Sequence, residues 1–431
     1  MSAITVALQQ LRQILSGEFP DEPGVQRFCV MLAEDEQNDA LAWLDGQSQY
    51  PQFYWRHRNG QEERAALGAV IHCDSFAEAQ QFCLEHRQRA DIRLYGLNAF
   101  DLHSAALFLP RLEWCHSASG ISLCLNLFSP HSLKEDALSA LAFLAKLAPA
   151  GSLTALSGEL LSEEQHPQWP EWERLIGLAT RAIGQGSLDK VVLARATDLT
   201  FQSGISAPSL MAASRLVNVN CYHFLMRFSA DSAFLGSSPE RLWQRIDTRL
   251  RTEALAGTVA HADVPDQRAA AGEWLLNDEK NQRENGLVVE DICQRLQKDV
   301  VGLDVFPQQL IHLRNIQHLK RAIQGTLKKP DDLRCLQQLQ PTAAVAGLPR
   351  EAARDFIQAH EPFDREWYAG SAGYLSHHRS EFCVALRSAK ISQQRVRLYA
   401  GAGIVEGSVA ELEWQEINNK AAGLRRLLTD N

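Results

Sequence analysis

Apolar residues recur along the chain with two different spacings, and each spacing predicts a set of secondary-structure elements. Intervals of three to four residues predict an N-terminal helix, on which Leu8, Leu11 and Leu15 share a face. The same intervals predict helices over residues 134–147, 170–185, 268–300 and 409–428. Short apolar or alternating runs predict strands over residues 121–127, 190–195, 221–228, 382–389 and 396–400. Because several strands follow one another without an intervening helix, we expect an α+β fold: one large domain of stacked, mostly antiparallel sheets flanked by helices.

The helix predicted over residues 409–428 carries charged residues on its apolar face. At about 100° per residue, one arc of this helix contains Leu412, Ile417, Ala421, Leu424, Leu427 and Leu428. Glu413, Glu416 and Lys420 lie inside the same arc. A Glu–Lys pair at this spacing is commonly a solvated ion pair, but buried charges are costly unless they are paired or bind a metal ion. This position favours Glu416, with Glu413 as a second candidate, as an oxygen ligand for a metal ion, and Lys420 as a binder of a carboxylate.

Other charged residues stand among apolar neighbours. Lys190 alternates with Val192 and Ala194 in a strand that is apolar on both faces, so this strand should be central and buried. Its amine is then either an edge group that reaches water or a functional group. Glu284 ends the apolar stripe of the helix predicted over residues 268–300, and Glu240 follows a tight turn. Taken alone, each of these two is more simply an ordinary surface carboxylate.

Gly401 and Gly403 follow an apolar strand. Glycines at such a position let the backbone approach an anion closely, although a bulge or a turn explains them as well.

Composition and charge narrow the class of protein. The 431 residues are 45% apolar and 22% charged, which is typical of a globular protein. A net charge of −9 gives no reason to expect nucleic acid or an anionic membrane as a partner.

The nine cysteines include no C-x-x-C pair, which argues against a disulfide framework and a thiolate zinc site and favours the cytoplasm. We expect no signal peptide and no membrane-spanning segment. Phosphate-loop, serine-hydrolase and HExxH motifs are absent from the sequence, so the candidate chemistry is that of carboxylates, lysine and a divalent ion.

The strings that carry these residues resemble the chorismate-utilising enzymes, a family that includes anthranilate synthase component I, aminodeoxychorismate synthase, salicylate synthase and isochorismate synthases. The first four matching strings are Lys190-Val-Val-Leu-Ala-Arg195, Ser238-Pro-Glu-Arg241, Ala256-Gly-Thr258 and Asn315-Ile-Gln-His-Leu-Lys320. The others are Pro341-Thr-Ala-Ala-Val-Ala-Gly-Leu-Pro349, Tyr368-Ala-Gly370, Tyr399-Ala-Gly-Ala-Gly-Ile404 and Glu413-Trp-Gln-Glu-Ile-Asn-Asn-Lys420. The resemblance implies an anthranilate synthase component I-like fold. In that fold, residues 1–150 are the divergent N-terminal half and residues 151–431 the chorismate-binding core, packed together as one compact domain.

The resemblance also implies a role for each matching position. Glu284 and Glu416 match ligands of Mg²⁺, with Glu413 in or near the same shell. The positions that match those holding the carboxylates and ring of chorismate are Gly257, Thr258, Tyr368, Arg387, Gly401 and Lys420. Lys190 matches the lysine of members that use water as the nucleophile, and Glu240 matches the general acid. Two residues depart from the pattern, because Asn285 and Gln340 stand where many members have histidine.

Within the family, the chain looks closest to the isochorismate synthases of menaquinone biosynthesis. The resemblance therefore implies a reversible, Mg²⁺-dependent conversion of chorismate to isochorismate, with Lys190 as general base and Glu240 as general acid. The acid has to be protonated before the reaction and the base neutral, so burial has to favour the uncharged form of both groups. We expect a monomer with no glutamine amidotransferase subunit. A salicylate synthase, which continues by eliminating pyruvate, and a non-catalytic chorismate-binding protein are the open alternatives.

Overall fold

The computed structural model describes residues 2–33, 39–89, 91–149, 151–260, 264–314 and 316–429. Its helices are α1 (Ala3–Leu15), α2 (Ala40–Asp45), α3 (Phe76–Glu85), α4 (Leu133–Ala145), α5 (Trp169–Gly184), α6 (Ala207–Val217), α7 (Pro265–Asn277), α8 (Glu279–Leu296), α9 (Asp332–Leu339), α10 (Arg350–His360) and α11 (Ala410–Thr429). The strands of the first half are β1 (Gly24–Met31), β2 (Gln52–Arg56), β3 (Glu63–Cys73), β4 (Leu94–Asn98), β5 (Ala105–Ser117), β6 (Gly120–Ser129), β7 (Leu160–His166), β8 (Lys190–Phe201), β9 (Tyr222–Arg227) and β10 (Ser232–Ser238). Those of the second half are β11 (Arg241–Ile246), β12 (Arg249–Ala260), β13 (Val300–Val305), β14 (Gln309–His312), β15 (Ile316–Leu327), β16 (Gly347–Leu348), β17 (Ser371–Leu375), β18 (Arg379–Val384), β19 (Ser388–Ser392) and β20 (Arg395–Ile404).

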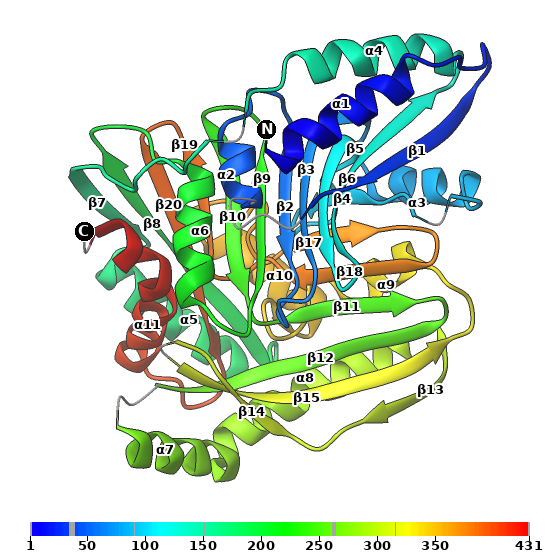
Figure 1. Ribbon diagram of the computed structural model, residues 1–431. Helices are drawn as coiled ribbons and strands as arrows, with labels where there is room; N and C mark the ends of the chain where they lie inside the picture. Colours follow the sequence, from blue (N-terminus) through cyan, green and yellow to red (C-terminus); the bar gives the residue numbers. More distant parts are fainter. Residues whose placement is uncertain are drawn as a thin grey trace.

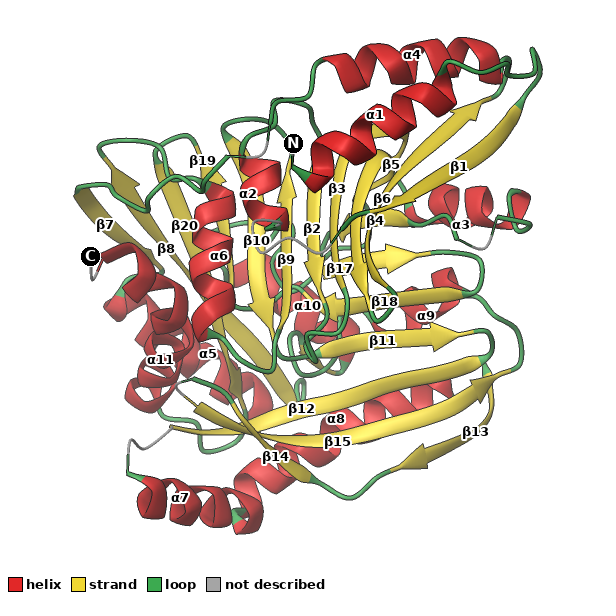
Figure 2. Ribbon diagram, viewed as in Figure 1, coloured by secondary structure: helices red, strands yellow, loops and turns green. Residues whose placement is uncertain are grey.

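The strands form one hydrogen-bonded network that branches at β5 (Figure 1). From one edge the order is β7, β8, β20, β19, β10, β9, β2, β3 and β5. One arm then continues through β6 to β1, and the other runs through β4, β17, β18, β11 and β12 to β15. Figure 2 shows the strands from β7 to β5 crossing the direction of β18, β11, β12 and β15, with helices around the sheets. These strand pairs are antiparallel, which confirms the predicted fold class.

Strands from before and after position 150 pair directly, so the chain forms one domain. β2 pairs with β9, and β4 pairs with β17. One apolar core contains Phe53 and Leu97 together with Tyr222 and Tyr399. Residues before and after the predicted division at position 150 therefore share both sheet and core.

Most predicted elements are present within two residues of their expected ends, although β8 continues to Phe201 and β20 to Ile404, beyond their predicted ends at 195 and 400. Two predicted elements are wrong. The helix predicted over residues 268–300 is two helices, because Asp278 ends α7 and its carboxylate accepts the N–H of Asn281 at the start of α8. The strand predicted over residues 382–389 is divided into β18 and β19. Arg387 lies between them with a left-handed φ of 48°, which a continuous strand cannot contain.

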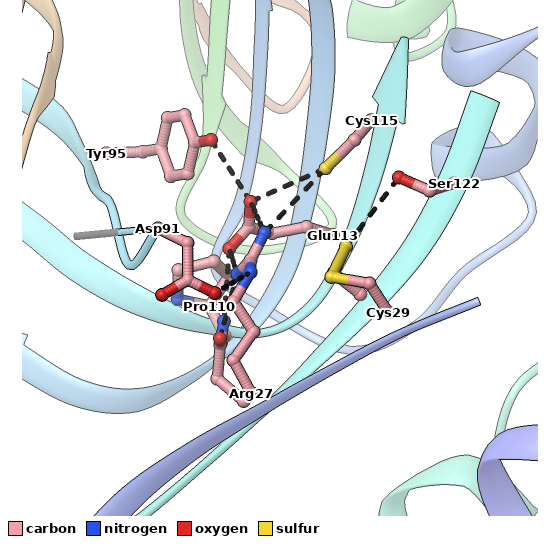
Figure 3. The surroundings of a disulfide bond; sticks show 10 residues. Arg27, Cys29, Asp91, Tyr95, Pro110, Glu113, Cys115 and Ser122 are labelled. Carbon is pink, nitrogen blue, oxygen red and sulfur yellow. Dashed lines mark hydrogen bonds and ion pairs between the residues drawn. A yellow bond between two sulfur atoms is a disulfide. The ribbon is translucent and has the colours of Figure 1, made fainter. Parts of the chain in front are cut away.

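The cysteine pattern also requires a correction. Cys29 and Cys124 form a disulfide with an S–S distance of 2.18 Å, next to the buried ion pair of Arg27 and Glu113 (Figure 3). The two cysteines face each other across β1 and β6, and their Cα atoms are 4.1 Å apart. Because 95 residues separate them in sequence, only the strand register reveals the pair. The other seven cysteines are free.

None of the described helices is both long enough and apolar enough to cross a lipid bilayer.

Candidate active site

Five of the predicted site residues line one cavity. They are Glu240 between β10 and β11, Tyr368 before β17, Arg387 between β18 and β19, Gly401 on β20 and Lys420 on α11. Apolar groups, among them Val192 and Leu255, and the imidazole of His318 complete the lining. A larger cavity of about 700 Å³, between α10 and the segment that precedes β17, contains none of the predicted site residues.

Lys190 is fully buried at the start of β8, where it pairs with Leu348 of β16 and where β20 pairs from the next residue onward. Its Nζ donates to Oε1 of Glu284 on α8 over 2.9 Å. The interpretation of Lys190 as an edge residue that reaches water is therefore wrong, and so is that of Glu284 as an ordinary surface carboxylate. Burial raises the pKa of Glu284, but the nearby charges of Lys190, Lys420 and Lys280 outweigh burial and hold this pKa below its ordinary value.

Gly401 and Gly403 lie inside β20, paired with β8, so they form no turn. A Cβ atom at position 403 would lie 2.6 Å from Oε1 of Glu284 and 3.0 Å from Cε of Lys190. A Cβ atom at position 401 would lie 2.8 Å from the hydroxyl of Tyr368. The two glycines therefore make room for the side chains of Glu284, Lys190 and Tyr368, whereas the approach of their backbone to an anion stays a prediction.

Glu240 is only 2% exposed, so its interpretation as a surface loop carboxylate is wrong. Burial, and next the negative charge of Glu253, raise the pKa of Glu240 to about 8, against the opposing charges of Lys190, Lys420 and Arg387. Its Oε1 atom is buried and has no hydrogen-bond partner among the described residues. Glu240 is therefore a protonated acid at neutral pH.

The raised pKa of Glu240 predicts that Glu240→Gln stabilises the fold above acidic pH. The folded protein keeps this proton up to about pH 8, whereas an unfolded chain releases it near 4.5. The stability of the wild type therefore falls as pH rises between these values, while a glutamine titrates nowhere in that window. We expect the free energy of unfolding of the variant to exceed that of the wild type by on the order of 3–5 kcal/mol at pH 8, and to equal it at pH 4. Urea unfolding at both pH values measures this difference, and an equal effect at the two values contradicts it.

His318 connects several predicted substrate contacts, although it is a residue without a predicted role. Its Nε2 lies 2.9 Å from the guanidinium of Arg387, and its Nδ1 lies 3.0 Å from the hydroxyl of Thr258 and 3.3 Å from the carbonyl of Gly257. Burial, and next the charges of Arg387 and Lys420, hold the pKa of His318 well below its usual value. The neutral ring accepts from Arg387 through Nε2, so Nδ1 carries the proton. In the sequence, His318 appeared only inside the family-matching string Asn315-Ile-Gln-His-Leu-Lys320. The first residue of this string, Asn315, lies outside the described residues.

The inward face of α11 agrees with the helical pattern at most positions. Glu413 is 3% exposed, and Glu416 and Lys420 are partly buried. Leu412 is 59% exposed, so its assignment to the buried arc is wrong; it lies at the edge of the arc in the first turn. Lys420 binds Oε1 of Glu416 at 2.5 Å and donates to the carbonyl of Gly401 at 2.9 Å.

The three carboxylates that the sequence assigns to Mg²⁺ are each paired with a lysine. Besides Glu284 with Lys190 and Glu416 with Lys420, Glu413 accepts from Lys280 of α8 at 3.3 Å. Lys280 had no predicted role, because its partner is on a helix 133 residues away. Among the described residues, no three acidic, histidine or cysteine side chains converge closely enough to bind a metal ion.

The chemistry of these carboxylates nevertheless suits Mg²⁺, which prefers oxygen ligands. Burial raises the pKa of Glu413, and repulsion by Glu416 raises it further. A divalent cation between the two carboxylates would remove this repulsion. Glu413 and Glu416 therefore suit a shared cation by their chemistry, whereas Glu284 pairs with Lys190, and its place in the same donor set stays a prediction.

Comparison with known proteins shows the family. The model of the chorismate binding enzymes matches residues 21–429. The chain belongs to this family. It is 57% identical to the isochorismate synthase MenF of Escherichia coli K12 over 431 residues, which cover 99% of each protein. The solved structure of that menaquinone-specific isochorismate synthase superposes with a TM-score of 0.97, at 56% identity over 99% of this chain and all of the other.

Anthranilate synthase component I of Streptococcus pneumoniae shares the fold of this chorismate-binding enzyme. The TM-score is 0.68 over 95% of this chain and 93% of the other, at 20% identity. The anthranilate synthase component I-like fold expected from the sequence is thereby confirmed.

Proposed function

We propose that the chain is an isochorismate synthase, which converts chorismate to isochorismate reversibly and with Mg²⁺, and supplies menaquinone biosynthesis. The observation that carries this proposal is that Lys190 and Glu240 are both buried and close enough for the charge of Lys190 to act on Glu240, while the pKa of Glu240 keeps this acid protonated. The full-length identity with an isochorismate synthase supports the same reaction.

In this structure Lys190 pairs with Glu284 as an ammonium group, so the proposed reaction requires that it first lose a proton. Its amine then accepts a proton from water as the oxygen of that water bonds to C2 of the chorismate ring. The ring double bonds move, and the bond from C4 to its hydroxyl group breaks. Glu240 donates its proton to the departing oxygen, which leaves as water. One water enters and one leaves, and proton exchange with solvent restores both side chains.

Substrate carboxylates are held by groups that line the cavity or contact its lining. Arg387, fixed by neutral His318, presents its guanidinium, and Lys420 presents an ammonium group. Tyr368, whose pKa burial raises to about 12, keeps its hydroxyl proton and donates it to the substrate. Gly257, Thr258 and Gly401 complete the proposed substrate contacts. Mg²⁺, held by Glu284, Glu413 and Glu416, would neutralise a substrate carboxylate when bound.

We further propose that residues 151–431 form the chorismate-binding core, because the proposed site residues all lie between positions 190 and 420. Water as the nucleophile makes an ammonia-producing amidotransferase subunit unnecessary. We also propose that the protein is a monomer of the cytoplasm.

Incubation of the purified protein with chorismate and Mg²⁺ tests the proposed function. We expect isochorismate to accumulate to an equilibrium with chorismate, without release of pyruvate. Salicylate and pyruvate as products would identify a salicylate synthase instead. Binding of chorismate without any turnover would identify a non-catalytic binding protein.

Glu416→Ala is expected to lose both the activity and the binding of Mg²⁺. Its carboxylate belongs to the proposed donor set, so the loss should weaken the binding of Mg²⁺ at least tenfold in calorimetry with the pure ion. Glu411→Ala, an exposed position on the same helix, is the matched control. A Glu416→Ala enzyme that Mg²⁺ still stimulates fully would exclude this ligand.

A further inference from the structure

We infer that Asn285 and Asn281 of α8 are positioning residues, which hold the Gly257–Thr258 segment of β12 in the conformation that binds the substrate. This inference rests on the proposed function, because it concerns two of the proposed substrate contacts. Neither asparagine lines the cavity, so both act through the backbone of β12.

The segment departs from regular strand geometry. The pairing of β12 with β15 shifts between Leu255 and Thr258: Leu255 faces Lys320, whereas Thr258 faces His318. Three residue steps on β12 thus correspond to two on β15, which is a β-bulge. Gly257 lies inside the bulge with a φ of 87°. A bulge leaves backbone carbonyls without their partners on the neighbouring strand, and buried carbonyls without partners are unfavourable.

Asn285 provides the missing donor. Its side chain is completely buried, and Nδ2 lies 3.1 Å from the carbonyl of Ala256, 3.3 Å from that of Leu319 and 3.5 Å from that of Ala254. These carbonyls come from both strands that flank the bulge. The Oδ1 atom of Asn285 has no hydrogen-bond partner among the described residues. The amide therefore serves as a donor to the bulge, at a position where many members of the family have histidine.

Asn281 holds the same segment from the preceding turn of α8. Its Oδ1 accepts the backbone N–H of Thr258 at 3.0 Å, while its Nδ2 donates to the Asp278 carboxylate at 2.7 Å. The bond to Asp278 fixes which end of the amide faces β12. A Cβ atom at position 257 would lie 3.2 Å from Cβ of Asn281, so the helix also packs tightly against the bulge.

The bulge places the hydroxyl of Thr258 against His318. The imidazole of His318 in turn fixes the position of the Arg387 guanidinium. Thr258 and Arg387 are proposed to contact substrate carboxylates, which do not react and which bind in the ground state and the transition state alike. Loss of the support by the two asparagines should therefore weaken binding equally in the ground state and in the transition state. Such a change raises KM and leaves kcat nearly unchanged. A general loss of fold would instead lower the amount of active enzyme without changing KM.

Kinetics of Asn285→Leu test the inference. Leucine keeps the side-chain volume but cannot donate to the carbonyls. We expect KM for chorismate to rise about tenfold, as loss of one buried hydrogen bond implies, with kcat within about threefold of the wild type. Chorismate binding in calorimetry should weaken by the same factor. Val288→Ala, a buried apolar position on the same helix, is the matched control, which should lower Tm but leave KM unchanged.

Asn281→Ala is the second variant, because this residue is only partly buried and its loss is less harmful to folding. It should also raise KM more than it lowers kcat. Unchanged KM in both asparagine variants, or an equal rise in Val288→Ala, overturns the inference. A wild type that does not convert chorismate would instead refute the proposed function, so the two failures are distinguishable.

Discussion

Lys190→Ala is expected to lower isochorismate formation by about a thousandfold or more, while chorismate still binds. A general base contributes about 10²–10⁴-fold to a rate, and the amine of Lys190 is the only group proposed to accept the proton of the attacking water. Substrate carboxylates are bound by other residues, so a Kd for chorismate close to that of the wild type should remain. Single-turnover measurements, together with calorimetric titration by chorismate, separate the chemical step from binding.

The loss of Lys190 also leaves Glu284 without its ion-pair partner, so the fold has to be checked in parallel. Lys190→Met keeps most of the buried volume without the amine and should be equally inactive, with a smaller change in Tm. Lys390→Ala, which removes a lysine that pairs with Glu366 outside the site, is the matched control and should retain activity. Turnover at the wild-type rate in Lys190→Ala would refute its assignment as the base.

The sequence predicted the class of the fold because its strongest signals are local. Apolar residues on both faces identified β8 as a buried strand, and helical periodicity placed α1, α4, α5 and α11. The division of the predicted helix into α7 and α8, and that of the predicted strand into β18 and β19, were not predicted, because each depends on a single residue. Asp278 begins a new helix through one carboxylate bond, and Arg387 interrupts a strand through a left-handed φ.

The candidate site was predictable where a charge stands in an apolar pattern, and this holds for Lys190, Glu413 and Glu416. Lys280, the partner of Glu413, and His318, the partner of Arg387, were not predictable from periodicity, since both obtain their roles from elements distant in sequence. The fully buried Asn285 appeared only as a departure from a family pattern. Its function follows from the β-bulge opposite α8, which the strand register alone reveals. The Cys29–Cys124 pair was missed for the same reason.

Glu240→Gln is expected to lower isochorismate formation by about 10²–10⁴-fold, because an amide cannot donate a proton to the departing hydroxyl group. The amide matches the size of the protonated acid, so chorismate should bind with nearly unchanged Kd. In the wild type, kcat/KM reports the free enzyme and should fall above about pH 8, where Glu240 loses its proton. Glu240→Asp retains a carboxyl group and should keep a residual activity that depends on pH. The glutamine variant has no carboxyl group to titrate at this position.

The alkaline limb of this profile can be assigned to Glu240 by changing its neighbour Glu253. The negative charge of Glu253 contributes to the raised pKa of Glu240, so Glu253→Gln should lower this pKa. The deprotonated, inactive form of Glu240 then appears at lower pH, and the fall in kcat/KM should move towards neutral pH. Since Glu253 also binds Arg58, Tm has to be recorded at each pH to exclude unfolding. If the limb stays in place while the protein remains folded, another group is the acid, and Glu240 loses the role that its burial suggests.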